Sequence, residues 1–201
     1  MVETDFYYTL GNKGSAEFKD RGSKFIALAF PIQSIPEFKQ NLDIVKKDHP
    51  KATHHCFAYR LGLDGNTFRV SDDGEPSGTA GRPILGQIDS KQLTNSLIIV
   101  VRYFGGTLLG VPGLINAYKN AAALVLQTTP VVQTQIEVKY SLQYDYTLMN
   151  EVMSIVKKQN ATIIEKEMTL FCRLVIGIQK SKLEETLYHL KELRSVEVQK
   201  L

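Results

Sequence analysis

The run SLIIVVRYF at residues 96–104 is the feature that most constrains the fold. It consists mainly of β-branched and other apolar residues and ends at Gly105–Gly106, which is typical of a strand buried on both faces. A glycine-rich turn, GGTLLGVPG at 105–113, then leads into the alanine-rich segment LINAYKNAAALVLQ at 114–127, which predicts a helix. A buried strand, a glycine turn and a helix in this order favour helices layered on a sheet.

The segments before this strand also alternate between strand and helix patterns. SKFIALAFPI at 23–32 is rich in β-branched and aromatic residues and predicts a strand. Residues 34–49 predict a helix, because apolar residues recur at helical spacing and Ser34 and Glu37 stand at the spacing of a capping box. Two further strands, joined by a turn, are expected at 54–63 and 67–71.

A second pattern begins at Pro130. Asp145 is expected to cap one helix, and Ser181 with Glu184 to form a capping box for another. The expected elements are a strand at 131–144, a helix at 145–160, strands at 161–170 and 171–179, a helix at 181–195 and a strand at 196–201. This β-α-β-β-α-β order is that of a ferredoxin-like unit. We therefore expect an α+β fold with two domains, residues 1–129 and 130–201.

Composition narrows the class of protein. The chain has 201 residues, of which 43% are hydrophobic and 22% charged, as in ordinary globular proteins. No segment approaches the roughly 20 apolar residues of a membrane span, and the N-terminus lacks the pattern of a signal peptide. The two cysteines are far apart in the sequence, which favours reduced thiols and a cytoplasmic location. A net charge of +3 leaves room for a basic binding site only as a local patch.

The segment SDDGEPSGTAGRPIL at 71–85 is dense in acids, glycines and prolines. Its acids Asp72, Asp73 and Glu75 offer the oxygen ligands that Mg²⁺ prefers. They are also suited to ordering turns, because aspartate side chains bond neighbouring backbone groups. Since no second acidic cluster accompanies them, we favour the turn interpretation and expect neither a metal nor a cofactor.

Two glycine-rich turns are candidate anion sites. Backbone amides that converge at a helix N-terminus attract anions, and Arg82 would add a bidentate donor beside SGTAG, where Thr79 is a candidate N-cap. Neither turn matches a Walker motif or a GxGxxG fingerprint, and two tight strand-to-helix turns are the alternative interpretation. The candidate residues are Gly78, Thr79, Gly81, Arg82, Arg102, Tyr103, Gly105 and Gly106.

The segment THHCFAYR at 53–60 offers further polar side chains. Only His54 and Cys56 would share one face of a strand, and two ligands do not close a zinc site. A Cys–His nucleophilic pair at this spacing is also disfavoured. Aromatic residues near Arg60 and Arg102 could stack bases, but they equally fit two buried strands whose arginines emerge at the ends.

Four segments together resemble the IMPACT/YigZ family: SKFIA at 23–27, ATHHCFAYR at 52–60, SDDGEPSGTAGRPIL at 71–85 and VVRYFGGTLLGVPGLINAY at 100–118. The resemblance implies an N-terminal domain like the second domain of a ribosomal small-subunit protein of the S-five type. It also implies a ferredoxin-like C-terminal domain similar to the fifth domain of elongation factor G. Eukaryotic relatives regulate translation initiation, so the resemblance implies a role in translation.

The sequence departs from the family pattern at three positions. The family commonly has Lys where this chain has Leu108, Gly at Pro112 and Arg at Asn116. Because phosphate contacts need Lys, Arg or backbone donors, these replacements shift the expected anion contacts to Arg82, Arg102 and backbone amides.

We therefore expect a ligand groove whose walls are the 71–85 loop and the 102–113 turn, with His54 and Arg60 at its floor. The leading hypothesis is a non-catalytic, translation-associated protein that binds RNA, a ribosomal surface or a protein partner. The second is an enzyme acting on a phosphorylated or nucleotide-like molecule, with an acid of the 71–85 loop as base or Mg²⁺ ligand. The third is a pure protein-interaction module.

Overall fold

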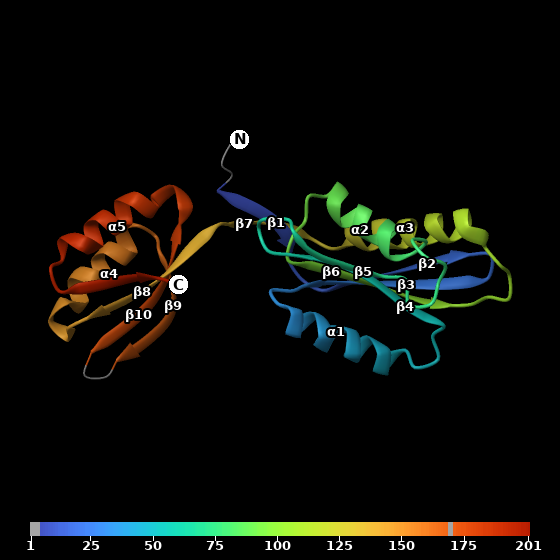
Figure 1. Ribbon diagram of the computed structural model, residues 1–201, viewed down its shortest axis with the longest axis horizontal. Coiled ribbons are helices and arrows are strands. Elements are labelled where there is room, and N and C mark those ends of the chain that lie inside the picture. The colour runs from blue at the N-terminus through green and yellow to red at the C-terminus, as the bar shows by residue number, and fades with distance from the viewer. Residues whose placement is uncertain (1–4, 169–170) are drawn as a thin grey trace. The chain divides into compact units, whose positions relative to one another are not determined.

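The fold is that of a computed structural model, which describes residues 5–168 and 171–201. Backbone contacts divide it into two compact units, Tyr7–Thr134 and a second formed mainly by Gln135–Leu201 (Figure 1). The strand β7 (Val131–Gln135), which follows the boundary expected at residue 130, pairs with β1 (Phe6–Leu10). No helix in the described ranges is long and apolar enough to cross a bilayer.

The first unit is built on a five-stranded sheet in the order β2-β3-β6-β4-β5. Every neighbouring pair in this sheet is antiparallel. The strands are β2 (Gly14–Asp20), β3 (Ser23–Pro31), β6 (Ser96–Tyr103), β4 (His54–Leu61) and β5 (Thr67–Ser71). Seven successive residues of β6, from Ser96 to Arg102, are buried, which confirms the prediction of a central strand covered on both faces.

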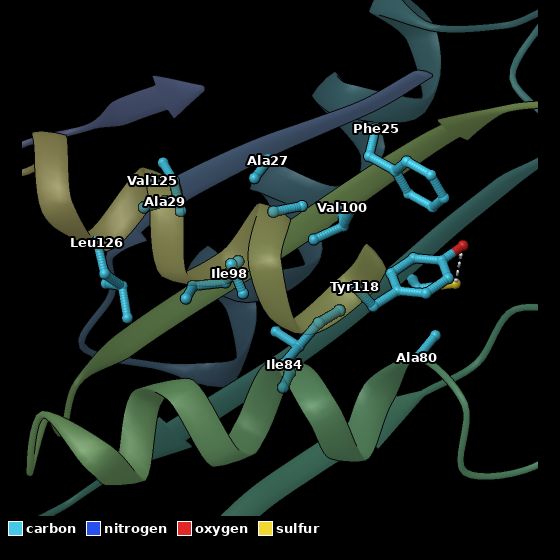
Figure 2. Packing of buried hydrophobic residues seen from close by; sticks show 14 of the residues in the cluster. Phe25, Ala27, Ala29, Ala80, Ile84, Ile98, Val100, Tyr118, Val125 and Leu126 are labelled. Atoms are coloured by element: carbon cyan, nitrogen blue, oxygen red, sulfur yellow. Dashed lines mark hydrogen bonds between the residues drawn. The ribbon is translucent and has the colours of Figure 1, made fainter. Parts of the chain in front are cut away.

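Helices cover both faces of this sheet. Figure 1 shows α1 (Ile35–Asp48) on one face, and α2 (Gly81–Ser90) and α3 (Gly110–Thr128) on the other. Side chains of β6 alternate between two cores, as the pleat of a strand requires. Ile98 and Val100 pack with α2 and α3, as Figure 2 shows, whereas Ile99 and Val101 join the core under α1.

The side-chain caps predicted from the sequence are present at only some of the helix starts. Ser34 caps α1 as expected, with Glu37 N donating to Ser34 Oγ at 3.4 Å, but the Glu37 carboxylate accepts from the Gln33 N–H at 2.9 Å in place of the Ser34 N–H of a capping box. Asp145 caps a short 3₁₀ turn (Tyr146–Leu148) that precedes α4 (Met149–Lys158), so it does not cap α4 itself. The expected capping box at Ser181 is wrong, because Ser181 lies in a 3₁₀ turn and α5 (Leu183–Glu192) begins without a side-chain cap.

The second unit is a four-stranded antiparallel sheet with α4 and α5 packed on it. Its strands are β8 (Glu137–Tyr144), β9 (Thr162–Met168), β10 (Cys172–Gln179) and β11 (Val196–Lys200), in the order β11-β8-β10-β9. This is the expected β-α-β-β-α-β arrangement, and the α+β class is confirmed. The single strand expected at 131–144 is divided at Ile136, whose N–H donates to the Asp5 carbonyl at 2.7 Å.

Candidate functional site

Asp72 organises the loop between β5 and α2. Its carboxylate accepts hydrogen bonds from the backbone N–H groups of Gly78 at 2.8 Å, Ala80 at 3.0 Å and Gly81 at 2.8 Å. Burial opposes ionisation, but these three donors, helped by the charge of Arg82, outweigh it and lower the pKa of Asp72. Asp72 therefore caps α2, although it precedes Gly81 by nine positions in the sequence.

The expected N-cap at Thr79 is wrong for the same reason. The Thr79 hydroxyl donates to the Pro76 carbonyl at 2.7 Å, and the helix begins with no side-chain bond from its own N-cap residue, Ala80. The amides of Gly78 and Gly81, expected to meet an anion, already donate to Asp72. A side chain on Gly81 would lie 2.8 Å from Ser71 N, so this glycine serves close packing.

Asp73 connects the same loop to the first residues of β4 by hydrogen bonds. Its carboxylate accepts from the His55 backbone N–H at 2.6 Å, and its carbonyl oxygen lies 2.7 Å from His54 Nδ1. The backbone of Asp73 is in the left-handed region at φ 43°, which Asp adopts more readily than most residues. Both aspartates thus shape the loop, as the turn interpretation expects.

Glu75 forms a buried ionic contact with Arg102 of β6. Arg102 Nη1 donates to Glu75 Oε1 at 2.6 Å, and the hydroxyl of Tyr118 on α3 donates to the same oxygen at 2.8 Å. The two ionised side chains are only 6% and 4% exposed. His54 Nε2 lies 3.8 Å from this oxygen, which is too far for a hydrogen bond. Residues from one loop, one strand and one helix meet at this carboxylate.

The network continues from Tyr118 to Cys56 of β4. The Cys56 sulfur lies 3.3 Å from the Tyr118 hydroxyl, a contact drawn in Figure 2, and 3.0 Å from the Asp72 carbonyl oxygen, and its single S–H proton is donated to one of these two oxygens at a time. Burial raises the pKa of the Cys56 thiol and of the Tyr118 hydroxyl. Both groups are therefore protonated at neutral pH, and Cys56 lacks the thiolate that a nucleophile requires.

Two aromatic rings enclose the Arg102 guanidinium. Its Cζ lies 5.5 Å from the ring centroid of Phe25 and 5.6 Å from that of Phe104, within the range of cation–π attraction. Nη2 reaches Ser23 Oγ at 3.4 Å. Among the buried side-chain nitrogen and oxygen atoms of the described residues, Arg102 Nε is the one without a hydrogen-bond partner.

A pocket of about 260 Å³ opens beside this pair. It lies between the 71–85 loop and the start of α3, where the sequence predicts a groove. Most of its wall is aliphatic, and Arg102 and Glu75 are the ionised residues that line it. The lining residues are Glu75, Pro76, Arg102, Leu108, Leu109, Gly110, Val111 and Leu114.

Several of the predicted site residues lie away from the pocket. Arg60 donates to Asp89 at 2.7 and 2.9 Å and pairs with Ser96, at the end of β4 opposite His54. Six residues of a strand span roughly 20 Å, so Arg60 does not belong to the floor of this pocket. Arg82 is exposed in the first turn of α2.

The remaining predicted residues have structural contacts. The Tyr103 hydroxyl lies 2.9 Å from His49 Nδ1, and its ring packs with the α1 core. The Gly105 amide donates to Ser23 Oγ at 3.3 Å. Gly105 also passes so close to Gly22 that a Cβ would lie 1.9 Å from its carbonyl carbon. Gly106 is exposed and adopts φ 85°.

Sequence reasoning missed Tyr118 and Ser23, which complete the contacts of Glu75 and Arg102. Tyr118 is the one aromatic residue in the alanine-rich helix pattern, and that exception was the available signal. Its partner could not be inferred, because Glu75 lies 43 residues away in the sequence. In the sequence, Leu108 stands out only as a departure from the family pattern, and Val111 has no distinguishing feature. Both residues nevertheless line the pocket.

The acids of the 71–85 loop do not gather as metal ligands would. Asp72 is bonded to three amides, Asp73 to β4, and Glu75 to Arg102 and Tyr118. Within residues 5–168 and 171–201, no group of three or more His, Cys, Asp or Glu side chains has the arrangement of a metal site. The geometry therefore gives the magnesium interpretation no support.

Comparison with known proteins identifies relatives over most of the chain. The profile of the Impact N-terminal domain matches residues 21–126. An IMPACT family member of Haemophilus influenzae is 32% identical over 167 residues, which are 81% of this chain and 80% of its own. YigZ of Escherichia coli, an IMPACT family member, is 31% identical over 165 residues and 81% of both chains. A crystal structure of a hypothetical protein superimposes with a TM-score of 0.78 at 26% identity, covering 98% of both chains.

Proposed function

The chain belongs to the IMPACT family, and we propose that it is a cytoplasmic, non-catalytic regulator of translation. In this proposal it binds a protein partner through the groove between the 71–85 loop and the 102–113 turn. Eukaryotic members of the family that the sequence resembles regulate translation initiation, and this supports the translational role. The free state of both cysteines is consistent with a reducing compartment.

The observation that carries the binding mode is the neutral, apolar character of the pocket. Arg102 is paired with Glu75, and the remaining lining is aliphatic apart from backbone. Phe104 and Leu108 beside it are 47% and 83% exposed. Exposed aromatic and aliphatic side chains around a pocket are features of protein-binding surfaces.

RNA is a weaker candidate for the same groove. Phosphate contacts use Lys and Arg side chains and backbone amides. Here the amides of Gly78 and Gly81 donate to Asp72, and Arg102 donates to Glu75. Arg82 is the arginine of the expected anion site that remains exposed.

The enzymatic alternative has no specific support in this geometry. A general base or metal ligand needs a carboxylate that can reach a substrate. Asp72 and Asp73 hold the loop together, and Glu75 is almost fully buried against Arg102. We therefore assign the acids of the loop to shaping the docking groove.

The test is an inhibition or stimulation assay in a bacterial cell-free translation extract. We expect the purified chain to change the yield of a reporter protein, and Leu108→Glu to lose most of that effect. Leu63→Glu is the matched control, because Leu63 is also an exposed leucine, at 51%, in the turn after β4. Loss of the effect in both variants, or in neither, would refute docking through this groove.

A chain without any effect on reporter yield would refute the translational role. Direct binding to short RNAs and to ribosomal RNA is measured in parallel at two salt concentrations. Affinity that falls steeply with salt, and falls again in Arg82→Ala, would replace the protein partner with RNA, because phosphate binding releases counterions.

A further inference from the structure

The segment from Tyr103 to Tyr118 carries no charged side chain. It contains no Asp, Glu, Lys, Arg or His, although it runs along the surface and contributes to the pocket. Leu108, Val111 and Ile115 stand at spacings of four or three residues and are 83%, 51% and 37% exposed. Val111 and Ile115 are four residues apart on α3 and share one face of it, and Leu108 lies in the turn just before the helix, so the start of α3 and this turn present uncharged apolar side chains beside the pocket.

The charges at the pocket cancel. Arg102 and Glu75 are bonded at 2.6 Å, and each side chain is at most 6% exposed. An anionic ligand that took the Arg102 Nη1 donor from Glu75 would leave this carboxylate buried without its counter-charge, which is strongly unfavourable. An uncharged group meets no such obstacle. The electrostatics of the pocket therefore select a neutral occupant.

The size of the pocket limits the occupant further. Its volume of about 260 Å³ is below the range of roughly 300–1,000 Å³ that holds drug-sized molecules. This space suits one large side chain better than a nucleotide. Its aliphatic wall of Leu108, Leu109, Val111 and Leu114 favours an apolar one.

We infer that the partner of this protein inserts one uncharged apolar side chain, of the size of Leu, Met or Phe, into this pocket. Its flanking backbone would lie on Leu108, Val111 and Ile115, which we call the Leu108 surface. The occupant is thus an apolar segment of another protein. This inference rests on the proposed function and specifies the contact by which the partner is recognised.

The probe for this contact is N-acetyl-leucinamide, with N-acetyl-glycinamide as its counterpart without a side chain and inorganic phosphate as the anion. Arg102 Nε–H is the reporter, because Arg102 lines the pocket and its Nε is buried in the protein. Its resonance is followed in nitrogen–proton correlation spectra of the full chain, assigned through the Arg102 backbone. We expect N-acetyl-leucinamide to shift this resonance with a dissociation constant on the order of 1 mM, and the other two probes to leave it in place.

The variant Leu108→Glu should weaken N-acetyl-leucinamide binding about tenfold, because it removes an aliphatic wall and adds a charge. The change is exposed and should leave the fold intact, which the unchanged resonances of β6 would verify. Leu63→Glu, on the turn after β4, should bind like the wild type. Equal binding by wild type and Leu108→Glu would overturn the inference.

Three other outcomes would also overturn it. The first is a shift of the Arg102 resonance by phosphate and not by N-acetyl-leucinamide, which would identify an anion site. The second is the absence of a response to all three probes. The third is a concentration-dependent dimer that Leu108→Glu converts to monomer, because a second copy of the chain would then cover the surface.

The translation assay separates this inference from the proposed function. A chain that alters reporter yield through Leu108, yet shows no response to N-acetyl-leucinamide, keeps its regulatory role and loses the side-chain contact. A chain that binds N-acetyl-leucinamide at this pocket without altering reporter yield keeps the contact and loses the role in translation.

Discussion

Glu75 supplies the negative charge that balances the buried guanidinium of Arg102. It is the counter-ion of a buried arginine, and removing one partner of such a pair leaves the other charge uncompensated. We expect Glu75→Gln to lower the free energy of unfolding by about 3 kcal/mol, measured by urea denaturation with circular dichroism. Glu17→Gln is the control, because Glu17 pairs with Lys24 on the surface, where both side chains are 41% exposed, and little change is expected there. Similar stability of the two variants would contradict a structural role for the buried pair.

The loop that caps α2 shows, at the scale of an element, what the sequence can and cannot reveal. The strand at 96–104 and the helix after it were predictable, because burial and helical spacing leave local patterns. The cap was not, because Asp72 reaches amides six to nine residues ahead across a loop whose path only the fold determines. Thr79 stood at the expected position and is bonded elsewhere. Residues from both predicted walls, the 71–85 loop and the 102–113 turn, line the pocket, whereas its neutral character depends on a contact between residues 27 positions apart.

The stability that Asp72 gives to this element should depend on pH. Its pKa is lower in the folded chain than the value near 3.9 of an unfolded Asp. Its contribution is therefore complete above about pH 4 and is lost as pH falls through the folded pKa. We expect Asp72→Ala to cost about 1–2 kcal/mol at pH 7, and the difference from wild type to shrink below about pH 4. Asp43→Ala on the exposed face of α1 provides the control, and a difference that stays constant down to pH 2 would contradict the capping role.

At the scale of the whole molecule, each hydrophobic core of the chain belongs to one of its two units. The core of the second unit, around Leu174, shares no residue with the two cores of the first. A cavity in one core removes packing from that unit alone. The free energy of unfolding should therefore fall by about 2–5 kcal/mol in the unit that contains the cavity and not in the other. Leu174→Ala and Ile98→Ala are matched, because both side chains are fully buried.

Native-state hydrogen exchange resolves this prediction along the chain. We expect Leu174→Ala to accelerate exchange of protected amides in β8 and β10 while those of β6 keep their wild-type rates, and Ile98→Ala to do the reverse. Amides that open only by unfolding of their own unit report its stability. If Leu174→Ala accelerated exchange in β6 as much as in β10, the two units would unfold as one. A substitution in the second unit would then also loosen the pocket beside Arg102, and its effect on translation could no longer be assigned to one unit.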